Sequence, residues 1–382
     1  MQVYLDNAAT SHPKPECVVK AVVRGMTELN CNPGRSGHDR AIAGAMALMS
    51  CRESLAKVLG CDDAMSVAFA FNCTDALNLA IKGSLSYADH VVTTMLEHNS
   101  VIRPLRTLEA QGMISLSIVE PNEEGIITPN AIRARLKRNT RLVAVTHASN
   151  VTGVIQPVAA IGKMLADTNA AFLVDGAQAI GVLPVNVKYL GATMYAFPGH
   201  KGLLGPQGTG GVYIDAGFDL NTVREGGTGS SSELTTQPRE RPERYESGTV
   251  NLHGLAGLDA GANFAMENEL TIRSHERALV EQMQRGLSQI DAVTVYCAGD
   301  VRNRVGVVSF NIGDYSSSAV ADCLNRAGIA VRGGLHCAPG THITLGTLER
   351  GAVRASVGYA TSAGDVEKLI KEVHNIAGNG LR

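Results

Sequence analysis

The sequence predicts an α/β protein, with a mostly parallel sheet in a large domain and a smaller α/β domain at its C-terminal end. From about residue 40 to 215, short apolar runs alternate with helical patterns, which is typical of a parallel sheet built through helical crossovers. A polar stretch rich in Gly, Ser and Pro at 225–244 then interrupts this alternation, and a different rhythm of elements follows it. We therefore expect a large domain over residues 1–255 and a small domain over 256–382.

The large domain is expected to consist of strands joined by crossover helices. Short apolar runs predict strands at 66–71, 90–95, 114–119, 142–146, 172–174, 194–197 and 211–214. Helical patterns predict helices at 41–59, 75–82, 101–111, 129–138 and 158–168, the last because Val158, Ile161 and Leu165 repeat with a period near 3.6. Because ligands of such sheets collect outside the carboxyl ends of the strands, functional residues are expected there.

The polar stretch and the C-terminal part complete the expected architecture. The stretch 225–244 has no period and is expected to form an ordered functional loop or a mobile lid. Long helical patterns at 252–267 and 271–290 lead into the small domain. There we predict strands at 292–296, 306–311, 329–332 and 352–357 and helices at 317–327 and 362–376.

Composition and charge exclude several classes of function. With 45% hydrophobic and 18% charged residues, the chain can build a sizeable core. Its 34 Lys and Arg against 36 Asp and Glu leave a net charge of −2, which argues against nucleic-acid binding as the main activity. No apolar run approaches the roughly 18 residues of a membrane span, and the first residues lack a signal-peptide pattern. We expect a soluble, cytoplasmic protein.

The cysteine pattern argues against metal and disulfide sites. Eight cysteines occur, at positions 17, 31, 51, 61, 73, 297, 323 and 337. None are spaced as C-x-x-C, and several lie in apolar stretches. We expect no metal site, and free thiols that are mostly buried, as in a reducing compartment.

Two charged residues, Lys201 and Asp175, lie where chemistry is expected. Lys201 follows an apolar run inside the Gly-rich AFPGHKGLLGPQGTGG, although a lone lysine there is more often a surface residue of a turn. The segment is not a phosphate-binding P-loop, because no Ser or Thr follows the lysine. Asp175 ends an apolar strand in FLVDGAQAIG, where it either caps the next helix or needs a cationic partner. A pyridine nitrogen facing Asp175 and a Schiff base on Lys201 would be a pyridoxal phosphate (PLP) arrangement.

Six motifs carry a family resemblance over nearly the whole chain. VDGAQ, GHKGLLGPQG, TTMLEHNSVIRPL, THASNVTG, ESGTVN and RGGLHCAPG, between YLDNAAT near the start and VRASVGY near the end, resemble those of the class V aminotransferase superfamily. Within it, the chain is most similar to the cysteine desulfurase and selenocysteine lyase branch. The resemblance implies a PLP enzyme of the aspartate aminotransferase fold (fold type I). It also implies a homodimer with sites at the subunit interface.

The resemblance implies roles for residues around the cofactor ring. Lys201 matches the Schiff-base lysine, and Asp175 matches the partner that keeps the pyridine nitrogen protonated. Gln178 resembles the donor to the phenolic oxygen, and His98 matches the histidine stacked on the ring, although a histidine closing a strand is more often a core or surface residue. Asn150 matches a residue near the cofactor and the substrate carboxylate.

A second group of residues is expected to hold the cofactor phosphate. In FNCTDALNLA, Thr74 can cap a helix that begins near Asp75, and free N–H groups at a helix start bind anions, although an ordinary N-cap would explain the segment equally well. The family often has two hydroxyl residues here, where this chain has Cys73 and Thr74. The resemblance adds His200, and Thr249 from the neighbouring subunit. Pro198 replaces a usual hydroxyl residue, so one phosphate contact is lost.

Cys337 is the residue that discriminates between activities. It lies in VRGGLHCAPGTH beside His336 and five residues after Arg332, and nearby cationic groups favour a thiolate. The loop resembles the catalytic-cysteine loop of the desulfurase branch, with Leu335 where a second histidine is common. The resemblance places Arg354 as the arginine that binds the substrate carboxylate, and groups Arg332 and Asn150 with it.

The leading interpretation is a cysteine desulfurase that converts L-cysteine to L-alanine and carries the sulfur on Cys337 as a persulfide. A selenocysteine lyase acting on L-selenocysteine would use the same residues. Another class V aminotransferase or lyase is a third interpretation. A non-catalytic scaffold with this fold would lack residues such as Lys201 or Arg354, which are present. A sulfur-acceptor protein is a further expected partner.

Overall fold

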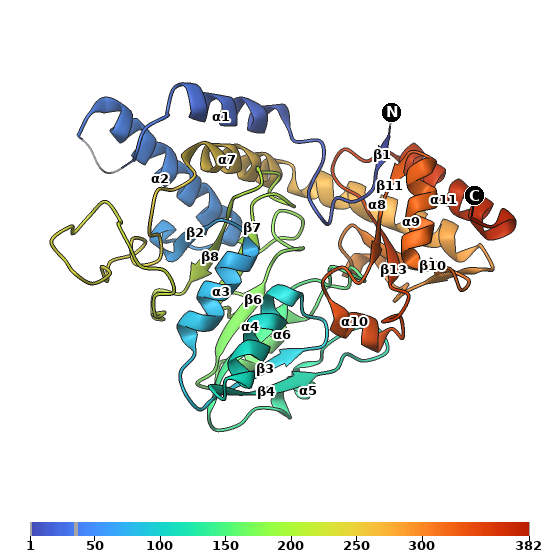
Figure 1. Ribbon diagram of the computed structural model, residues 1–382, viewed down its shortest axis with the longest axis horizontal. Coiled ribbons are helices and arrows are strands. Elements are labelled where there is room, and N and C mark those ends of the chain that lie inside the picture. Colours follow the sequence, from blue (N-terminus) through green and yellow to red (C-terminus); the bar gives the residue numbers. More distant parts are fainter. Residues whose placement is uncertain (1, 34–36, 382) are drawn as a thin grey trace.

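The computed structural model describes residues 2–33 and 37–381. Its larger part is built on a seven-stranded sheet of order β2-β8-β7-β6-β5-β3-β4 (Figure 1). Strands β7, β6, β5, β3 and β4 are parallel to one another, and β8 runs antiparallel between β2 and β7. The mostly parallel sheet is therefore confirmed. Its strands are β2 (Val67–Ala70), β3 (Asp89–Thr94), β4 (Ile114–Val119), β5 (Thr140–Thr146), β6 (Ala171–Asp175), β7 (Met194–Pro198) and β8 (Gly210–Ile214).

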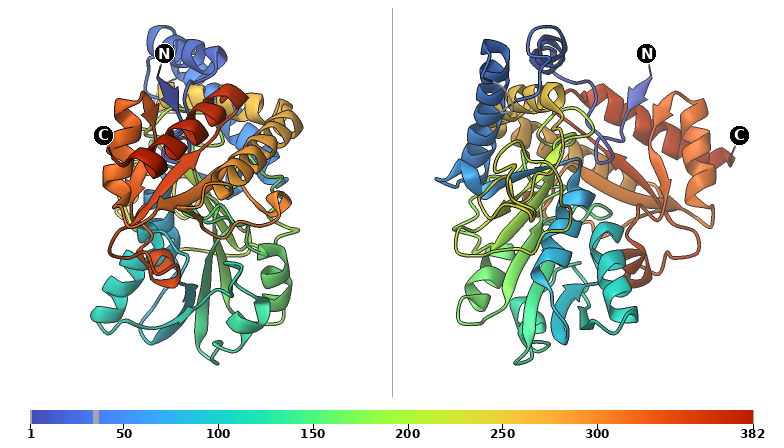
Figure 2. Two further views of the ribbon diagram at one scale, coloured as in Figure 1. Left: turned by 90° about the vertical axis from the view of Figure 1, so that its right-hand side faces the viewer. Right: turned by 60° about the vertical axis from the view of Figure 1, so that its left-hand side comes forward.

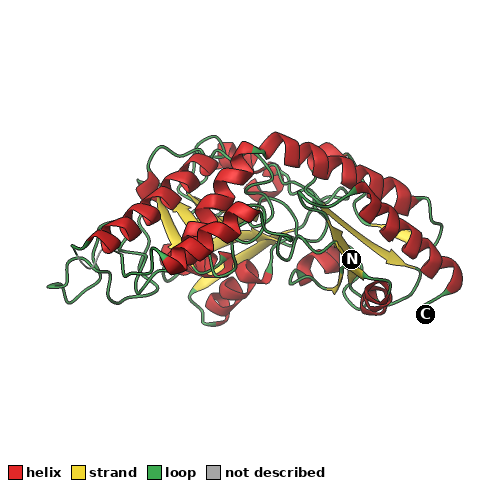
Figure 3. Cartoon of the chain, turned by 90° about the horizontal axis from the view of Figure 1, so that it is seen from above, coloured by secondary structure: helices red, strands yellow, loops and turns green. Residues whose placement is uncertain are grey.

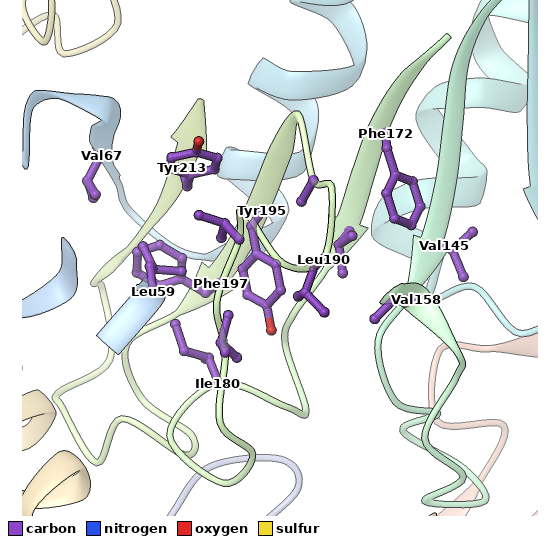
Figure 4. Close-up of a cluster of buried hydrophobic side chains, with 14 of the residues drawn as sticks. Leu59, Val67, Val145, Val158, Phe172, Ile180, Leu190, Tyr195, Phe197 and Tyr213 are labelled. Carbon is purple, nitrogen blue, oxygen red and sulfur yellow. The ribbon is translucent and has the colours of Figure 1, made fainter. Parts of the chain in front are cut away.

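Helices cover both faces of this sheet. Successive residues of a strand point to opposite faces, so in β6 Phe172 and Val174 enter one core and Ala171 and Leu173 the other. The first core is closed by α2 (Asp39–Leu59), α6 (Val158–Leu165) and α7 (Leu252–Glu267), and the second by α3 (Cys73–Ser84) and α4 (Asn99–Ala110). Figure 4 shows the first core, with the ring of Tyr195 among the aliphatic side chains. Burial on both faces explains why the strands appear in the sequence as continuous apolar runs.

The smaller part of the molecule has its own sheet and its own core. Four strands of order β12-β13-β10-β9 pair antiparallel. In the view of Figure 3 they lie apart from the large sheet, with helices around both. The elements of this part are α8 (Glu269–Ser288), β9 (Val293–Val295), β10 (Val307–Ile312), α9 (Ser317–Arg326), β11 (Ile329–Ala330), β12 (Arg332–Gly334), α10 (Pro339–Thr344), β13 (Ala352–Ser356) and α11 (Ala363–Asn379).

The N-terminal segment connects the two parts. Strand β1 (Val3–Tyr4) pairs in parallel with β11 of the smaller part, and Figure 2 shows it in blue beside the orange elements. The chain then passes through residues 5–15 into α1 (Glu16–Thr27), which packs against α7. Segments from the two ends of the sequence therefore lie side by side.

Several predicted elements differ from those observed. The sequence predicted no element before residue 41, so β1 and α1 were missed, as was the short helix α10. The helix predicted at 129–138 is only α5 (Pro129–Arg133), because the Arg135 and Leu136 N–H groups bond carbonyls three residues back and tighten the chain into a turn. The strand predicted at 329–332 is split, since the chain leaves β1 and joins β13.

The polar stretch forms the expected loop, whereas the cysteines are less buried than expected. Residues 225–244 form turns without helix or strand, as predicted for a loop. No disulfide joins any of the eight cysteines, all of which lie in the described part of the chain, and the expectation that most of them are buried is wrong. Cys51 and Cys73 are buried, Cys17 is exposed and the other five are partly exposed.

Candidate active site

A cavity of about 220 Å³ lies at the carboxyl ends of the parallel strands. Its wall is formed by the ends of strands β5, β6 and β7, the first turns of α3 and α4, the N-terminal segment and the paired strands β12 and β13. Ten of the twelve residues singled out from the sequence line it: Cys73, Thr74, His98, Asn150, Asp175, Gln178, His200, Lys201, Arg332 and Arg354. Cys337 and Thr249 are not on its wall. The arrangement follows the rule for ligand sites of α/β sheets.

Asp175 and Lys201 supply a carboxylate and an amine to this cavity. Asp175 is only 3% exposed, and its Oδ1 accepts a hydrogen bond from the Ala177 N–H at 3.0 Å and contacts the Cys73 thiol at 3.5 Å. Neither contact neutralises the charge, so the carboxylate is suited to a cationic ligand group. Burial, followed by the charge of Arg354, lowers the pKa of Lys201. A lowered pKa increases the fraction of free amine, which is the nucleophilic and basic form.

His98 is oriented by its own helix. It is the N-cap of α4, where its Nδ1 accepts a hydrogen bond from the Ser100 N–H at 3.1 Å, which leaves the proton of the neutral ring on Nε2. Burial lowers the pKa of His98, against the opposite effect of Asp175. The Ser100 hydroxyl lies 2.7 Å from that of Thr74, which connects the first turns of α4 and α3.

The first turn of α3 and His200 both line the cavity. The helix begins at Cys73, and its cap is Asn72, whose side chain accepts from the Asp75 N–H. The prediction that Thr74 caps a helix starting near Asp75 is therefore wrong, and the reason is that Asn72 adopts the extended cap conformation and reaches the third N–H of the helix. The Nδ1 of His200 is buried without a partner, and burial together with Lys201 lowers the pKa of His200 to about 4. A neutral imidazole nitrogen without a partner can donate to a bound anion.

Arg354 is held from two sides, and its buried Nε has no partner. It is 1% exposed; its Nη1 donates to the Asn150 carbonyl at 3.0 Å and its Nη2 to Asp6 Oδ1 at 2.9 Å. Its Nε is buried without a partner. Arg332 lies directly opposite on the neighbouring strand and lines the same cavity. Two guanidinium groups on one wall, of which Asp6 compensates one, are suited to a carboxylate ligand.

Cys337 lies in a loop whose backbone is strained. His336 and Cys337 both have positive φ, 49° and 58°, a conformation that costs non-glycine residues energy and often occurs at functional sites. Arg332 Nη2 lies 3.8 Å from the Cys337 sulfur, and the Cys337 carbonyl accepts from the Asn99 N–H. The ring of His336 is buried and bonds the Ala352 carbonyl, so that Leu335, not a histidine, is the exposed neighbour.

Thr249 does not line the cavity that holds the other candidate residues. It is exposed and lines a separate surface hollow with Phe71 and Arg224. The structure of one chain does not bring it to the cavity, and its expected role concerns a neighbouring subunit.

Three residues that contribute to the site were not singled out from the sequence. Asp6 holds Arg354, Glu97 precedes His98, and Lys14 contacts the residue before Lys201. Asp6 lies in YLDNAAT and Glu97 in LEHNS, two motifs that had been noticed without assigning these positions. Lys14 carried no local signal.

The Glu97 carboxyl, next to His98, is buried and has a raised pKa. Its Oε1 accepts from the Thr146 N–H and the Thr94 hydroxyl, its Oε2 is buried without a partner, and burial raises the pKa of the carboxyl to about 8. A carboxyl with a raised pKa in the fold keeps its proton where the unfolded chain has lost it. As the pH rises from about 4.5 to 8, the free energy of unfolding therefore falls by up to about 1.4 kcal/mol per pH unit.

The Glu97→Gln variant should remove this slope. We expect its stability, measured by urea unfolding from pH 5 to 8, to rise relative to the unmodified chain by roughly 1 kcal/mol per pH unit. Other titrating groups are shared by both proteins and cancel in the difference. A difference that stays constant with pH would show that Glu97 is ionised in the fold.

Among residues 2–33 and 37–381, no group of three or more His, Cys, Asp or Glu side chains is placed to hold a metal ion. In the same residues, no helix combines the length and apolar character needed to span a bilayer.

Comparisons with known proteins agree on one family. The sequence model of the family described as Aminotransferase class-V matches residues 3–369. A probable cysteine desulfurase of Methanothermobacter thermautotrophicus is 36% identical over 99% of this chain and 95% of its own length, and one of Pyrococcus abyssi is 34% identical over 96% and 92%. The apo structure of a cysteine desulfurase from Thermococcus onnurineus NA1 superposes with a TM-score of 0.92 at 33% identity, covering 99% of this chain and 95% of that one.

Proposed function

The chain belongs to the class-V aminotransferase family and has its fold, and from this premise we propose that it is a PLP-dependent cysteine desulfurase. The reaction is L-cysteine plus the Cys337 thiol giving L-alanine plus a persulfide on Cys337. The observation that carries the proposal is the position of Cys337 beside Arg332, in the connection between the paired strands β12 and β13, which bring Arg332 and Arg354 to the cavity that Lys201 and Asp175 line.

The residues present fit the cofactor. The buried Asp175 carboxylate, the Lys201 amine and the His98 ring line one cavity, and the start of α3 with the unpartnered Nδ1 of His200 would hold a phosphate. Bound PLP supplies an electron sink that stabilises negative charge at the substrate Cα. Pro198 ends β7 and offers neither hydroxyl nor N–H, so the helix start and His200 would hold the phosphate in this chain.

Lys201 and Asp175 divide the proton chemistry between them. The buried Asp175 carboxylate would hold a proton on the pyridine nitrogen of the cofactor. Lys201 would attach the cofactor, and its lowered pKa suits its Nζ to take the Cα proton of the substrate. Gln178, whose Nε2 donates to the Ala8 carbonyl at 3.1 Å, retains a second N–H for the cofactor.

Substrate orientation follows from Arg354 and Asn150. The free Nε–H of Arg354 is a ready donor for the substrate carboxylate, because Asp6 and the Asn150 carbonyl hold the rest of the guanidinium. Asn150 also donates to the His336 carbonyl at 2.7 Å and thereby connects the substrate end to the Cys337 loop. The Nη2 of Arg332, a residue that also lines the cavity, lies 3.8 Å from the Cys337 sulfur.

The Cys337 sulfur then bonds to the substrate sulfur while the carbon–sulfur bond of the substrate breaks. The electron pair of that bond stays with the carbon, which takes up a proton as alanine forms. A sulfur-acceptor protein would remove the persulfide sulfur from Cys337.

The proposal includes a homodimer in which Thr249 reaches the neighbouring site. Its support is the exposure of Thr249 beside Phe71, which is itself half exposed, and an exposed apolar row on α1 formed by Val19, Val23 and Met26. Sedimentation equilibrium of the purified chain measures the oligomeric state, and a monomer at micromolar concentration would contradict this part.

A selenocysteine lyase is the second candidate, because Cys337 does not line the cavity and selenium is a better leaving atom that needs less assistance from the thiol. The experiment that separates the two measures alanine release from L-cysteine and from L-selenocysteine, with mass spectrometry of Cys337. Alanine from L-cysteine together with persulfide on Cys337 supports the desulfurase; activity confined to selenocysteine contradicts it.

A further inference from the structure

Four hydrogen-bond donors of the N-terminal segment converge on one carbonyl oxygen, that of His200. The Ser11 N–H lies at 3.1 Å, the Ser11 hydroxyl at 3.1 Å, the Thr10 hydroxyl at 3.2 Å and the Lys14 ammonium at 2.9 Å. Lys14 also donates to the Ser11 hydroxyl at 2.7 Å, so this hydroxyl accepts from the lysine while it donates to the carbonyl. A carbonyl oxygen has two lone pairs, and its surroundings here are unusually crowded with donors.

The His200 carbonyl lies directly next to the candidate Schiff-base lysine in the chain. It belongs to the peptide bond that joins His200 to Lys201, so its direction sets the direction of the Lys201 backbone. The next hydrogen bonds of the loop run from the Leu204 N–H to the Lys201 carbonyl and from the Gly205 N–H to the Gly199 carbonyl. The loop is also held by the Gly199 N–H, which donates to the Thr209 carbonyl, and by the Leu203 side chain, which is buried in the first core. The N-terminal segment adds the contacts at the His200 carbonyl.

The lysine stays in this place at a cost to stability. It is partly buried, and burial lowers its pKa to about 8. The two hydrogen bonds of its ammonium go to neutral groups, the Ser11 hydroxyl and the His200 carbonyl. An ammonium that exchanges hydration for neutral partners gains little stability for the fold as a whole. We therefore expect Lys14 to act on the geometry of the loop.

We propose that Lys14 is a positioning residue of the active site, which through the His200 carbonyl orients both the Lys201 side chain and the His200 ring toward the cavity. The proposal deepens the proposed function, since it concerns the residues that would attach PLP and hold its phosphate. It also explains why a segment that pairs with the small domain through β1 contacts the cavity of the large one.

The test compares Lys14→Met, Lys14→Arg and Ser11→Ala with the unmodified full chain. Hydrogen exchange of the 199–205 peptide is measured in the cofactor-free and PLP-loaded proteins, together with the PLP dissociation constant and the melting temperature. Lys14→Met should raise the exchange rate and the dissociation constant by roughly tenfold each, the size of one charge-assisted hydrogen bond. Ser11→Ala should raise both quantities by a smaller factor. Lys14→Arg should keep most of the exchange protection and most of the PLP affinity of the unmodified chain.

The melting temperature separates positioning from general support, because Lys14→Met should leave it unchanged or raise it. The matched control is Lys20→Met, an exposed lysine of α1 that pairs with Glu16, which should alter neither exchange nor PLP binding. Unchanged exchange and PLP affinity in Lys14→Met would overturn the proposal, as would a lowered melting temperature with loosening spread over the whole chain. Failure of the desulfurase proposal would be recognised separately, as absence of cysteine turnover by the unmodified chain while the exchange difference persists.

Discussion

The Lys201→Ala variant is expected to lose turnover of L-cysteine entirely and to bind PLP without a covalent bond. Lys201 is the amine on the wall of the cavity whose pKa burial lowers, and the Asp175 carboxylate shares that wall. A positioned general base contributes roughly 10²–10⁴-fold to rate, and here the same residue would also attach the cofactor. The measurements are alanine release and the amount of PLP that remains attached after borohydride reduction.

The fold should survive this substitution. Lys201 is not part of any core cluster, and the glycines and hydrogen bonds of its loop are unchanged by it. Far-ultraviolet circular dichroism and the melting temperature verify this, with the exposed Lys163→Ala on α6 as a control that should keep full activity. Turnover by Lys201→Ala at a rate close to that of the unmodified chain would remove Lys201 from the proposed mechanism.

The Cys337→Ser variant is expected to lose roughly a hundredfold or more of its turnover of L-cysteine, equivalent to about 2.7 kcal/mol of transition-state stabilisation. A hydroxyl near neutral pH is a far poorer nucleophile toward sulfur than a thiolate. Covalent PLP should be retained, because Lys201, Asp175 and Arg354 are untouched. Turnover of L-selenocysteine should remain measurable, since selenium leaves more readily.

Mass spectrometry should find the persulfide on Cys337 in the unmodified chain and none in the variant. The exposed thiol of Cys17, on α1, provides the matched control, and Cys17→Ser should change neither activity nor persulfide. Equal rates on cysteine with and without the Cys337 thiol would refute the sulfur-transfer mechanism. A purely structural thiol would instead lower stability and affect both substrates alike.

Much of the larger part of the molecule could be predicted because its signals are local. The apolar runs that became β3, β5, β6 and β7 are buried on both faces, and such burial leaves a direct trace in the sequence. The short α5 and the split of β11 from β12 could not be predicted, because the first depends on a turn and the second on a change of pairing partner.

The candidate site shows the same division. The motifs around Asp175, Lys201 and His98 placed these residues at the ends of strands or the starts of helices, and the topology then brings those ends to one cavity. The burial of His336, the exposure of Leu335 and the cap at Asn72 depend on packing around each position. A pattern along the chain does not encode such packing.

The sequence by itself determined the fold class, the family resemblance and ten residues of the cavity wall, because strand ends and motifs are properties of short segments. Only the tertiary structure decided that Asp6 holds Arg354, 348 positions away, and that Lys14 meets the His200 carbonyl, 186 positions away. The physical reason is that partners so distant in sequence are selected by the closure of the whole chain, which here carries β1 to β11 and draws the N-terminal segment across the cavity.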